Sequence, residues 1–312
     1  MIDNLIIIIP THNRQHYLRR VVKYYSSFPC KVYICDSSKE RAEIECSDNI
    51  SYRWVPQSNF YGKVLDVLNE TSADFYALSP DDDFLKKETL MECYDYLAVN
   101  SEFAMANGRQ YLFQKEYDMR LFYNPAANGF INVQTIANDT EGVKYYWKHY
   151  QNMLGSIFRR KAILNAFKVL TNCGFNNGNF VELVLSIESL KLGYVYISDN
   201  PFNFMEINPS EHWGNTTLPI SWGSYVKSSS LRKDIRSFYR FYNNDSIAKD
   251  CLKWHIGNPY RELFLLVYSR FRKLMKKIQC KDNGAKFTVV SLPEVKDGEM
   301  IQRIAISYKE MM

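Results

Sequence analysis

The sequence has no long hydrophobic run. Its longest strongly apolar stretch, at residues 5–9 of 312, is far shorter than the roughly 20 apolar residues of a membrane-spanning helix. We therefore expect no transmembrane segment and, because no basic stretch precedes this run, no secretory signal. The composition is 46% hydrophobic and 23% charged, which is typical of a globular protein and excludes a disordered or collagen-like chain.

Several chemical signatures are missing as well. The seven cysteines are odd in number and show no C-x-x-C spacing, which argues against a structural zinc site or a disulfide framework. A reducing cytoplasm is the simplest location for such a chain. P-loop, G-x-G-x-x-G and G-x-S-x-G motifs are absent from the sequence, and no arrangement indicates a Ser/His/Asp or Cys/His nucleophile.

Charge is present, but it is unevenly distributed. The net charge of +5 combines 21 basic and 25 acidic residues at 1–224 with 14 basic and 4 acidic residues at 225–281. The remaining residues, 282–312, are nearly balanced, with 4 basic and 5 acidic side chains. This asymmetry predicts two regions, a main domain at 1–224 and a basic, mainly helical C-terminal region at 225–312.

Strand and helix patterns alternate over the first hundred residues. The pattern predicts strands at residues 5–10, 31–35, 51–55, 75–78 and 103–107, with helices at 14–27, 61–69 and 88–99. Such alternation indicates an α/β fold with a mostly parallel sheet. Further along, a helix is predicted at 182–192, a strand at 194–197, and helical structure from 228 to 277 with a break near 257–259.

Polar clusters follow three of the predicted strands, at residues 10–13, 36–38 and 81–83. Because ligands bind outside the carboxyl ends of parallel strands, we expect these clusters to share one crevice. The last cluster is Asp81-Asp82-Asp83, whose carboxylates repel one another and need a cation, a helix N-terminus or solvent. Mg²⁺ or Mn²⁺ would supply the cation and could bridge to phosphates. The alternative is a solvated acidic turn before the next helix.

The same residues carry a family resemblance. The strand at 6–10 followed by Thr-His-Asn-Arg resembles the opening of the family 2 glycosyltransferases, and Asp36 matches that family's second-strand aspartate. Residues 59–69, with Lys63, and 75–84 resemble the segment before its Asp-x-Asp element and that element itself. The resemblance implies a GT-A fold, a Rossmann-like and mostly parallel sheet flanked by helices, here with a C-terminal helical extension. Its nucleotide-binding half would be about 1–108 and its acceptor half about 109–224.

The resemblance also implies roles for individual residues. A nucleotide-sugar donor, expected to be a UDP-sugar, would be held together with Mn²⁺ or Mg²⁺. The expected donor-binding residues are Pro10, Thr11, Asn13, Asp36, Lys63, Asp81 and Asp82, and the expected metal ligand is Asp83. The family's usual pattern is Asp-x-Asp-Asp, whose first place is Pro80 here, so Asp82 stays open as an alternative ligand.

Two further elements complete the expected site. Residues 178–182, followed by Gly193, resemble the acidic pair at the start of a helix in inverting members, with Val181 where the first acid usually stands. Glu182 would then deprotonate the acceptor hydroxyl; the alternative is a carboxylate favoured by the helix dipole. His212 would be a late metal ligand or a structural hydrogen-bonding residue.

The basic C-terminal region allows three interpretations. Its cationic and aromatic side chains could form an amphipathic helix on an anionic membrane surface, a nucleic-acid site, or a packed helical layer with solvated charges. No nucleic-acid module is recognisable, so no nucleic-acid partner is expected.

Taken together, the resemblance and the polar clusters imply a metal-dependent glycosyltransferase, inverting by preference, although retaining chemistry stays open. The acceptor would be a glycan or a lipid-linked acceptor in bacterial surface polysaccharide synthesis. The location would be the cytoplasm, with a peripheral position on the inner face of the cell membrane as an option. Alternatives are a catalytically inactive sugar-binding or scaffold protein and, with less support, a nucleic-acid-associated protein. The oligomeric state, donor sugar and linkage are not fixed by the sequence.

Overall fold

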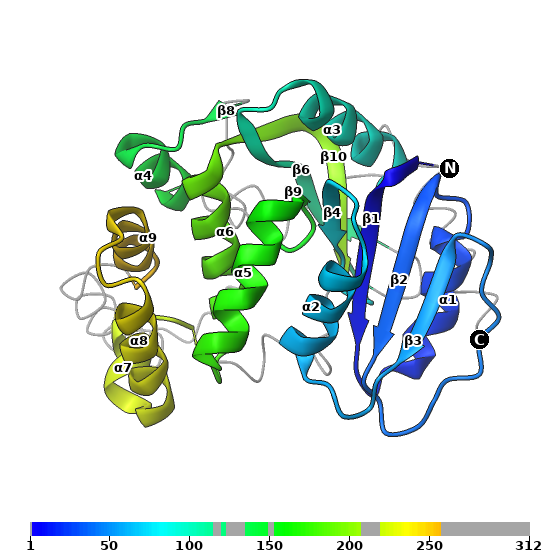
Figure 1. The fold of residues 1–312 in the computed structure, drawn as a ribbon, viewed down its shortest axis with the longest axis horizontal. Helices are drawn as coiled ribbons and strands as arrows, with labels where there is room; N and C mark the ends of the chain where they lie inside the picture. Colours follow the sequence, from blue (N-terminus) through cyan, green and yellow to red (C-terminus); the bar gives the residue numbers. More distant parts are fainter. Residues whose placement is uncertain (1, 115–119, 123–134, 149–152, 207–218, 257–312) are drawn as a thin grey trace, which may run out of the picture.

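A computed structural model describes residues 2–114, 120–122, 135–148, 153–206 and 219–256. Within these residues a ten-stranded sheet is flanked by helices (Figure 1). The path through the sheet is β3-β2-β1-β4-β9-β6-β10-β5, with β7 paired to β6 and β8 paired to β10. The mixed α/β class with a mostly parallel sheet, predicted from the sequence, is confirmed.

The N-terminal part of the sheet is parallel. Its strands are β1 (Ile2–Thr11), β2 (Cys30–Asp36), β3 (Ile50–Trp54) and β4 (Phe75–Leu78). The connecting helices are α1 (Gln15–Tyr25) and α2 (Phe60–Glu70), and α3 (Lys87–Val99) follows the acidic triplet. All of the apolar run 5–9 is buried, as expected for a parallel strand that helices cover on both faces.

The remaining strands are of mixed direction. The long strands β6 (Phe103–Gln114) and β10 (Tyr194–Glu206) are parallel, while β9 (Ile157–Arg159) is antiparallel to both β4 and β6. The short strand β5 (Asp83–Leu85) pairs antiparallel with β10. Two further short strands are β7 (Arg120–Phe122) and β8 (Thr135–Ile136). β10 is longer than the predicted 194–197 because it continues past irregularities in its register with β6.

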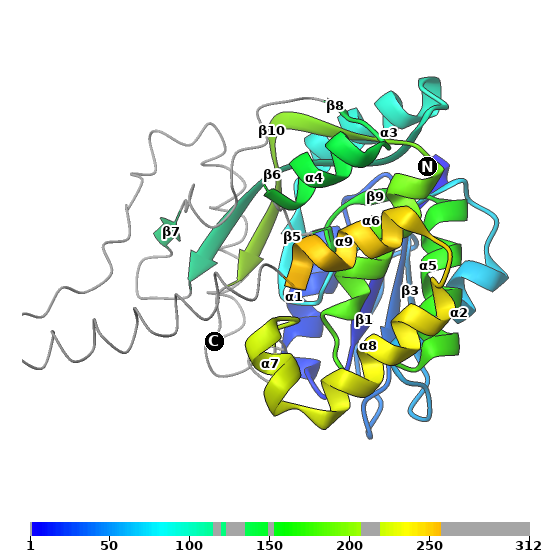
Figure 2. The same cartoon turned by 90° about the vertical axis from the view of Figure 1, so that its left-hand side faces the viewer.

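Six more helices lie between residues 140 and 256 of the described chain. They are α4 (Thr140–Lys148), α5 (Arg160–Cys173), α6 (Phe180–Leu192), α7 (Trp222–Lys227), α8 (Ser229–Phe241) and α9 (Ser246–Ile256). α8 packs on α5, and α9 packs on α6 and α4. Figure 2 shows α8 and α9 in front of α5 and α6, which lie between them and the sheet.

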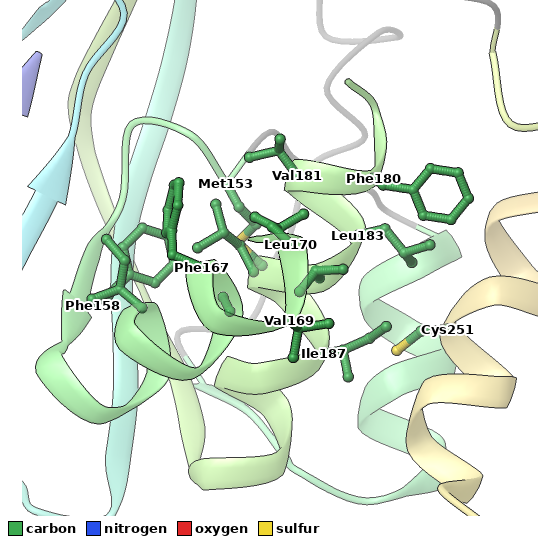
Figure 3. Packing of buried hydrophobic residues seen from close by; sticks show 14 of the residues in the cluster. Met153, Phe158, Phe167, Val169, Leu170, Phe180, Val181, Leu183, Ile187 and Cys251 are labelled. Carbon is green, nitrogen blue, oxygen red and sulfur yellow. The ribbon is translucent and has the colours of Figure 1, made fainter. Parts of the chain in front are cut away.

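Apolar side chains hold this helical layer together. Figure 3 shows side chains of α5 and α6 meeting Cys251 of α9. The buried Phe238 of α8 belongs to the same core. The basic C-terminal region is therefore packed at residues 229–256.

The helical pattern of this region has an interruption between α8 and α9 that the sequence did not predict. The interruption is a turn where the Asp245 N–H donates to the Tyr242 carbonyl and the Asp245 carboxylate accepts from the Ala248 N–H at the start of α9. The predicted break near 257–259 lies outside the described residues, and the division at residue 225 stays a prediction. No helix in the described part of the chain is both long and apolar enough to cross a membrane.

The connection from α6 to β10 fixes the direction of α6. Gly193 is the single residue between them, and a Cβ at this position would lie 2.2 Å from the Glu102 carbonyl oxygen. Only glycine fits this approach. Because α6 ends at the start of β10, its N-terminus lies toward the edge at which the parallel strands end (Figure 1).

Candidate active site

The three polar clusters meet at the carboxyl ends of β1, β2 and β4. The Thr11 hydroxyl donates to the Asp81 carboxylate at 2.5 Å, and the Asn13 N–H donates to Ser38 Oγ at 2.7 Å. Pro10, one residue before the end of β1, pairs with Cys35 of β2 and is partly exposed. The predicted meeting of the clusters is confirmed, and we call residues 10–14, 36–38 and 81–83 together with Lys63 the strand-end site.

Asp36 lies at the base of the strand-end site and is fully buried. Its carboxylate accepts from the Ser38 N–H at 2.8 Å, from the Ser38 hydroxyl, and from the Tyr52 hydroxyl at 2.7 Å. These donors compensate the burial of the charge.

Lys63 joins the first two clusters from α2. Its Nζ donates to the Thr11 carbonyl at 2.5 Å and to Ser37 Oγ at 3.0 Å. Burial lowers the pKa of Lys63 to about 8. The ammonium therefore ties the ends of β1 and β2 together and contributes positive charge beside Asp36 and Asp81.

Arg14 belongs to the strand-end site, and the sequence did not reveal its role. Its Nη1 lies 2.7 Å from Asp81 Oδ1 and its Nη2 lies 2.8 Å from Asp82 Oδ2. Asn13, immediately before it, has a φ of 54°, a left-handed conformation that asparagine tolerates better than most residues. Burial raises the pKa of Asp81 to about 6, although the charge of Arg14 opposes the shift.

Asp83 is placed differently from its two neighbours. It opens β5 opposite Met205 of β10 and is only 7% exposed. Burial and the adjacent charge of Asp82 raise the pKa of Asp83 well above its ordinary range. Arg14 thus offsets part of the negative charge at Asp81 and Asp82, whereas the Asp83 carboxylate is buried beside them without an ion pair among the described side chains.

The donor set fits a hard divalent cation that is completed by a ligand. Within the described residues no group of three or more His, Cys, Asp or Glu side chains is arranged to hold a metal. Mg²⁺, however, is commonly held by one or two carboxylates together with substrate phosphates and water. Asp83 offers such a carboxylate. His212 lies outside the described residues.

A buried ion pair supports this end of the site. Arg20 Nη1 lies 2.7 Å from Glu206 Oε2, with side-chain exposures of 1% and 3%. The Arg20 guanidinium also lies over the rings of Tyr17 and Phe84. Glu206 directly follows Met205, the residue of β10 that pairs with Asp83. The ion pair between Arg20 and Glu206 therefore holds the part of β10 to which β5 is paired.

Glu182 occupies the first turn of α6, as predicted. The residue as a whole is partly exposed, but its carboxyl group is buried, and this burial raises the pKa of the carboxyl to about 7. Tyr146 of α4, which is fully buried, is a neighbouring titratable group. A carboxyl that titrates near neutrality can take up a proton under ordinary conditions, which is what a general base requires.

One helical turn of α2 touches both the strand-end site and the loop before α6. Lys63 bonds the ends of β1 and β2, while the Tyr61 hydroxyl donates to the Phe175 carbonyl at 3.1 Å. The strand ends and the segment that leads to Glu182 are therefore held by residues two positions apart.

The fold is similar to that of known structures. Staphylococcus aureus TarS 1–349 in complex with UDP-GlcNAc matches with a TM-score of 0.50 and 13% identity, over 81% of this chain and 72% of that one. The chain has a GT-A-like fold. A further structure of TarS 1–349 and its complex with UDP match with TM-scores of 0.47 and 0.45, each at 13% identity over 81% of this chain and 71% of that one. No protein-family model and no curated protein matches the chain.

Sequence reasoning missed several contributors to the site. Arg14, Tyr52 and Ser38 bond the acidic residues directly, and Arg20 pairs with Glu206 across 186 positions. For Arg14 the sequence did offer a signal. An arginine directly follows the first polar cluster, which was expected to meet the triplet of carboxylates at 81–83. For Tyr52 the sequence offered no signal, because the register between β2 and β3, which pairs Tyr52 with Ile34, brings its hydroxyl within reach of Asp36.

Proposed function

We propose that this chain is a glycosyltransferase that binds a nucleotide-sugar at the strand-end site. The observation that carries the proposal is the acidic triplet brought together with Thr11, Asp36 and Lys63 at the ends of the parallel strands, on a GT-A-like fold. The similar structure of TarS contains UDP-GlcNAc, which supports a UDP-sugar as the donor.

The donor would lie across the ends of the parallel strands. Asp36 and the loop Pro10–Asn13 would contact the base and ribose, Lys63 the nucleotide, and Asp81 and Asp82 the ribose or sugar. Arg14 would add a guanidinium beside the diphosphate. The contacts among these residues in the structure support one continuous binding surface.

The cation would be Mn²⁺ or Mg²⁺, held by Asp83 and, from outside the described residues, His212. Asp83 is favoured over Asp82 because Arg14 already pairs with Asp82 at 2.8 Å. When bound, the cation would stabilise the negative charge of a departing nucleoside diphosphate.

Glu182 would act as the general base. Its carboxylate would accept the proton of the acceptor hydroxyl as that oxygen attacks the anomeric carbon, giving single displacement with inversion. The pKa of about 7 supports this role, because the carboxyl is then both substantially deprotonated at neutral pH and basic enough to hold a proton.

The acceptor would be a glycan or a lipid-linked glycan in bacterial surface polysaccharide synthesis. The outer face of α8 exposes Lys233, Arg236 and Arg240, and Tyr239 and Phe241 beside them are 44% and 47% exposed. Cationic and aromatic side chains together suit an anionic membrane surface. They support a cytoplasmic protein that lies peripherally on the inner membrane face, with residues 225–312 as the docking region.

A panel of sugar nucleotides tests the proposal. We expect one of them, with Mn²⁺, to be hydrolysed slowly and to raise the melting temperature of the protein, and Glu182→Gln to abolish turnover while keeping the thermal shift. Thermal stabilisation with no turnover by the unaltered chain would indicate the catalytically inactive sugar-binding alternative. Neither turnover nor stabilisation by any donor would refute the proposed function.

A further inference from the structure

A buried carboxylate on α8 holds the loop in front of α6. Asp234 accepts from the Asn176 N–H at 3.1 Å and from the Asn177 N–H at 2.9 Å, and the Asn176 side-chain amide donates to it at 3.0 Å. Asp234 is only 2% exposed, and no lysine, arginine or histidine of the described chain pairs with it. Its charge is therefore compensated by the N–H groups of this loop.

The hydrogen bonds continue from this loop to the start of α6. Asn177 Oδ1 accepts from the Asn179 N–H at 3.0 Å, and Asn179 is the residue that caps α6. The Asn177 carbonyl accepts from the Phe180 N–H at 3.1 Å, and the Asn179 carbonyl accepts from the Leu183 N–H at 3.4 Å. Glu182 lies within this first turn.

Aromatic packing fixes the same loop to α8. The rings of Phe175 and Phe180 are stacked, with centroids 4.3 Å apart, and Phe180 also contacts Phe238. Phe238 lies four residues after Asp234, so both face the loop from one side of α8. On its other side the loop is tied to α2 through Tyr61.

We infer that Asp234 is a positioning residue for the general base, and that α8 is thereby part of the catalytic machinery rather than only a docking or packing element. This inference rests on the proposed function, in which Glu182 is the base. Burial of a carboxylate costs free energy, and an apolar side chain could hold a loop in place without this cost. The three N–H groups that donate to Asp234 all belong to the segment that sets where α6 begins. The bonds between that segment and the Asn179 cap transmit the position of Asp234 to the first turn.

The experiment compares Asp234→Ala and Asp234→Asn with Tyr61→Phe, which cuts the tie to α2, and with Asp250→Asn as a control on α9. The measurements are kcat and KM for the best sugar nucleotide of the panel, the pH dependence of kcat, and UDP binding by calorimetry with Mn²⁺. A further readout that needs no turnover is the Glu182 titration, followed by carboxyl ¹³C resonances and assigned by the signal lost in Glu182→Gln.

We expect Asp234→Ala to lower kcat at least tenfold with donor KM and UDP affinity changed less than twofold. The midpoint of the pH profile and the NMR titration should move below 7, because a loosened first turn admits water to the carboxyl. Asp234→Asn, which keeps one acceptor oxygen, should be intermediate, Tyr61→Phe should shift both in the same direction by less, and Asp250→Asn should match the unaltered chain.

Folded Asp234 variants with unchanged kcat, pH profile and Glu182 titration would overturn the inference while leaving the proposed function intact. Should Asp234→Ala not fold, Asp234→Asn and Tyr61→Phe decide the question by the same measurements. If the unaltered chain turns over no donor, the proposed function fails, and the Glu182 titration alone then decides whether Asp234 sets the environment of that carboxyl.

Discussion

Glu182→Gln separates the catalytic value of the Glu182 carboxyl from its effect on stability. Burial raises the pKa of this group from 4.5 to about 7, so the folded protein binds the proton more tightly than the unfolded chain does. Folding stability is therefore lost as the pH rises from about 4.5 to 7, and the full cost persists above 7. At 1.36 kcal/mol per pKa unit this cost is about 3–4 kcal/mol, and the partial exposure of the residue reduces it to about 1–3 kcal/mol.

Glutamine has nearly the same shape and cannot ionise. We therefore expect Glu182→Gln to be more stable than the unaltered protein by about 1–3 kcal/mol at pH 8 and equally stable near pH 4.5. The same change should lower kcat about 10²–10⁴-fold. In the unaltered protein kcat should fall about tenfold for each pH unit below 7. Urea unfolding monitored by circular dichroism at both pH values gives the stability, and donor turnover gives the rate.

A second glutamate of α6 provides the control. Glu188 is more completely buried than Glu182, and its carboxylate accepts from the Tyr242 hydroxyl at 2.8 Å and lies 3.3 Å from Lys191 Nζ. Glu188→Gln should therefore lower stability at pH 8 and leave kcat unchanged. A Glu182→Gln protein that is no more stable than the unaltered one at pH 8 would refute the argument from burial, and one that keeps full activity would refute the assignment of the base.

Three further predictions concern the strand-end site and its support. Arg14→Ala removes the guanidinium that bridges Asp81 and Asp82. The variant should therefore melt at a lower temperature than the unaltered chain without metal, and Mn²⁺ should raise its melting temperature by more. An equal rise with Mn²⁺ in both proteins would contradict this. Glu206→Ala should cost about 3–5 kcal/mol in urea unfolding because it removes a carboxylate 2.7 Å from a buried guanidinium, whereas Arg20→Met with Glu206→Leu should cost much less; equal losses would contradict a contribution from this ion pair. Asp83→Asn should bind UDP as before in EDTA but lose the gain in affinity that Mn²⁺ gives, measured by calorimetry, and a retained gain would exclude Asp83 as the ligand.

Local patterns in the sequence were sufficient for the first hundred residues. The helices and strands predicted there agree with α1–α3, β1–β4 and the start of β6, because each strand is an apolar run and each helix shows apolar spacing. The meeting of the polar clusters followed from strand direction alone. These features depend on neighbours in sequence and on the general rule for parallel sheets.

The rest depends on contacts between distant segments. β9 is three residues long and takes its place between β4 and β6 by antiparallel pairing, which periodicity cannot detect. Asp83 was expected to follow the end of the strand predicted at 75–78, but pairing with Met205 places it in a further strand, β5. The bond between Asp234 and the loop before α6 joins residues 57 and 58 positions apart, and no local signal distinguishes this aspartate from an exposed one.

The pairing of β5 with β10 has a consequence for the order in which the site forms. The contacts of Thr11, Asp36 and Lys63 involve only the first 81 residues, so they can close early during synthesis. Asp83 must wait for Met205, more than a hundred residues later, and non-local strand pairing of this kind is slow. In a nascent or truncated chain the contacts of Thr11, Asp36 and Lys63 would therefore form before Asp83 is placed, and the site would become complete only when nearly the whole sheet has assembled.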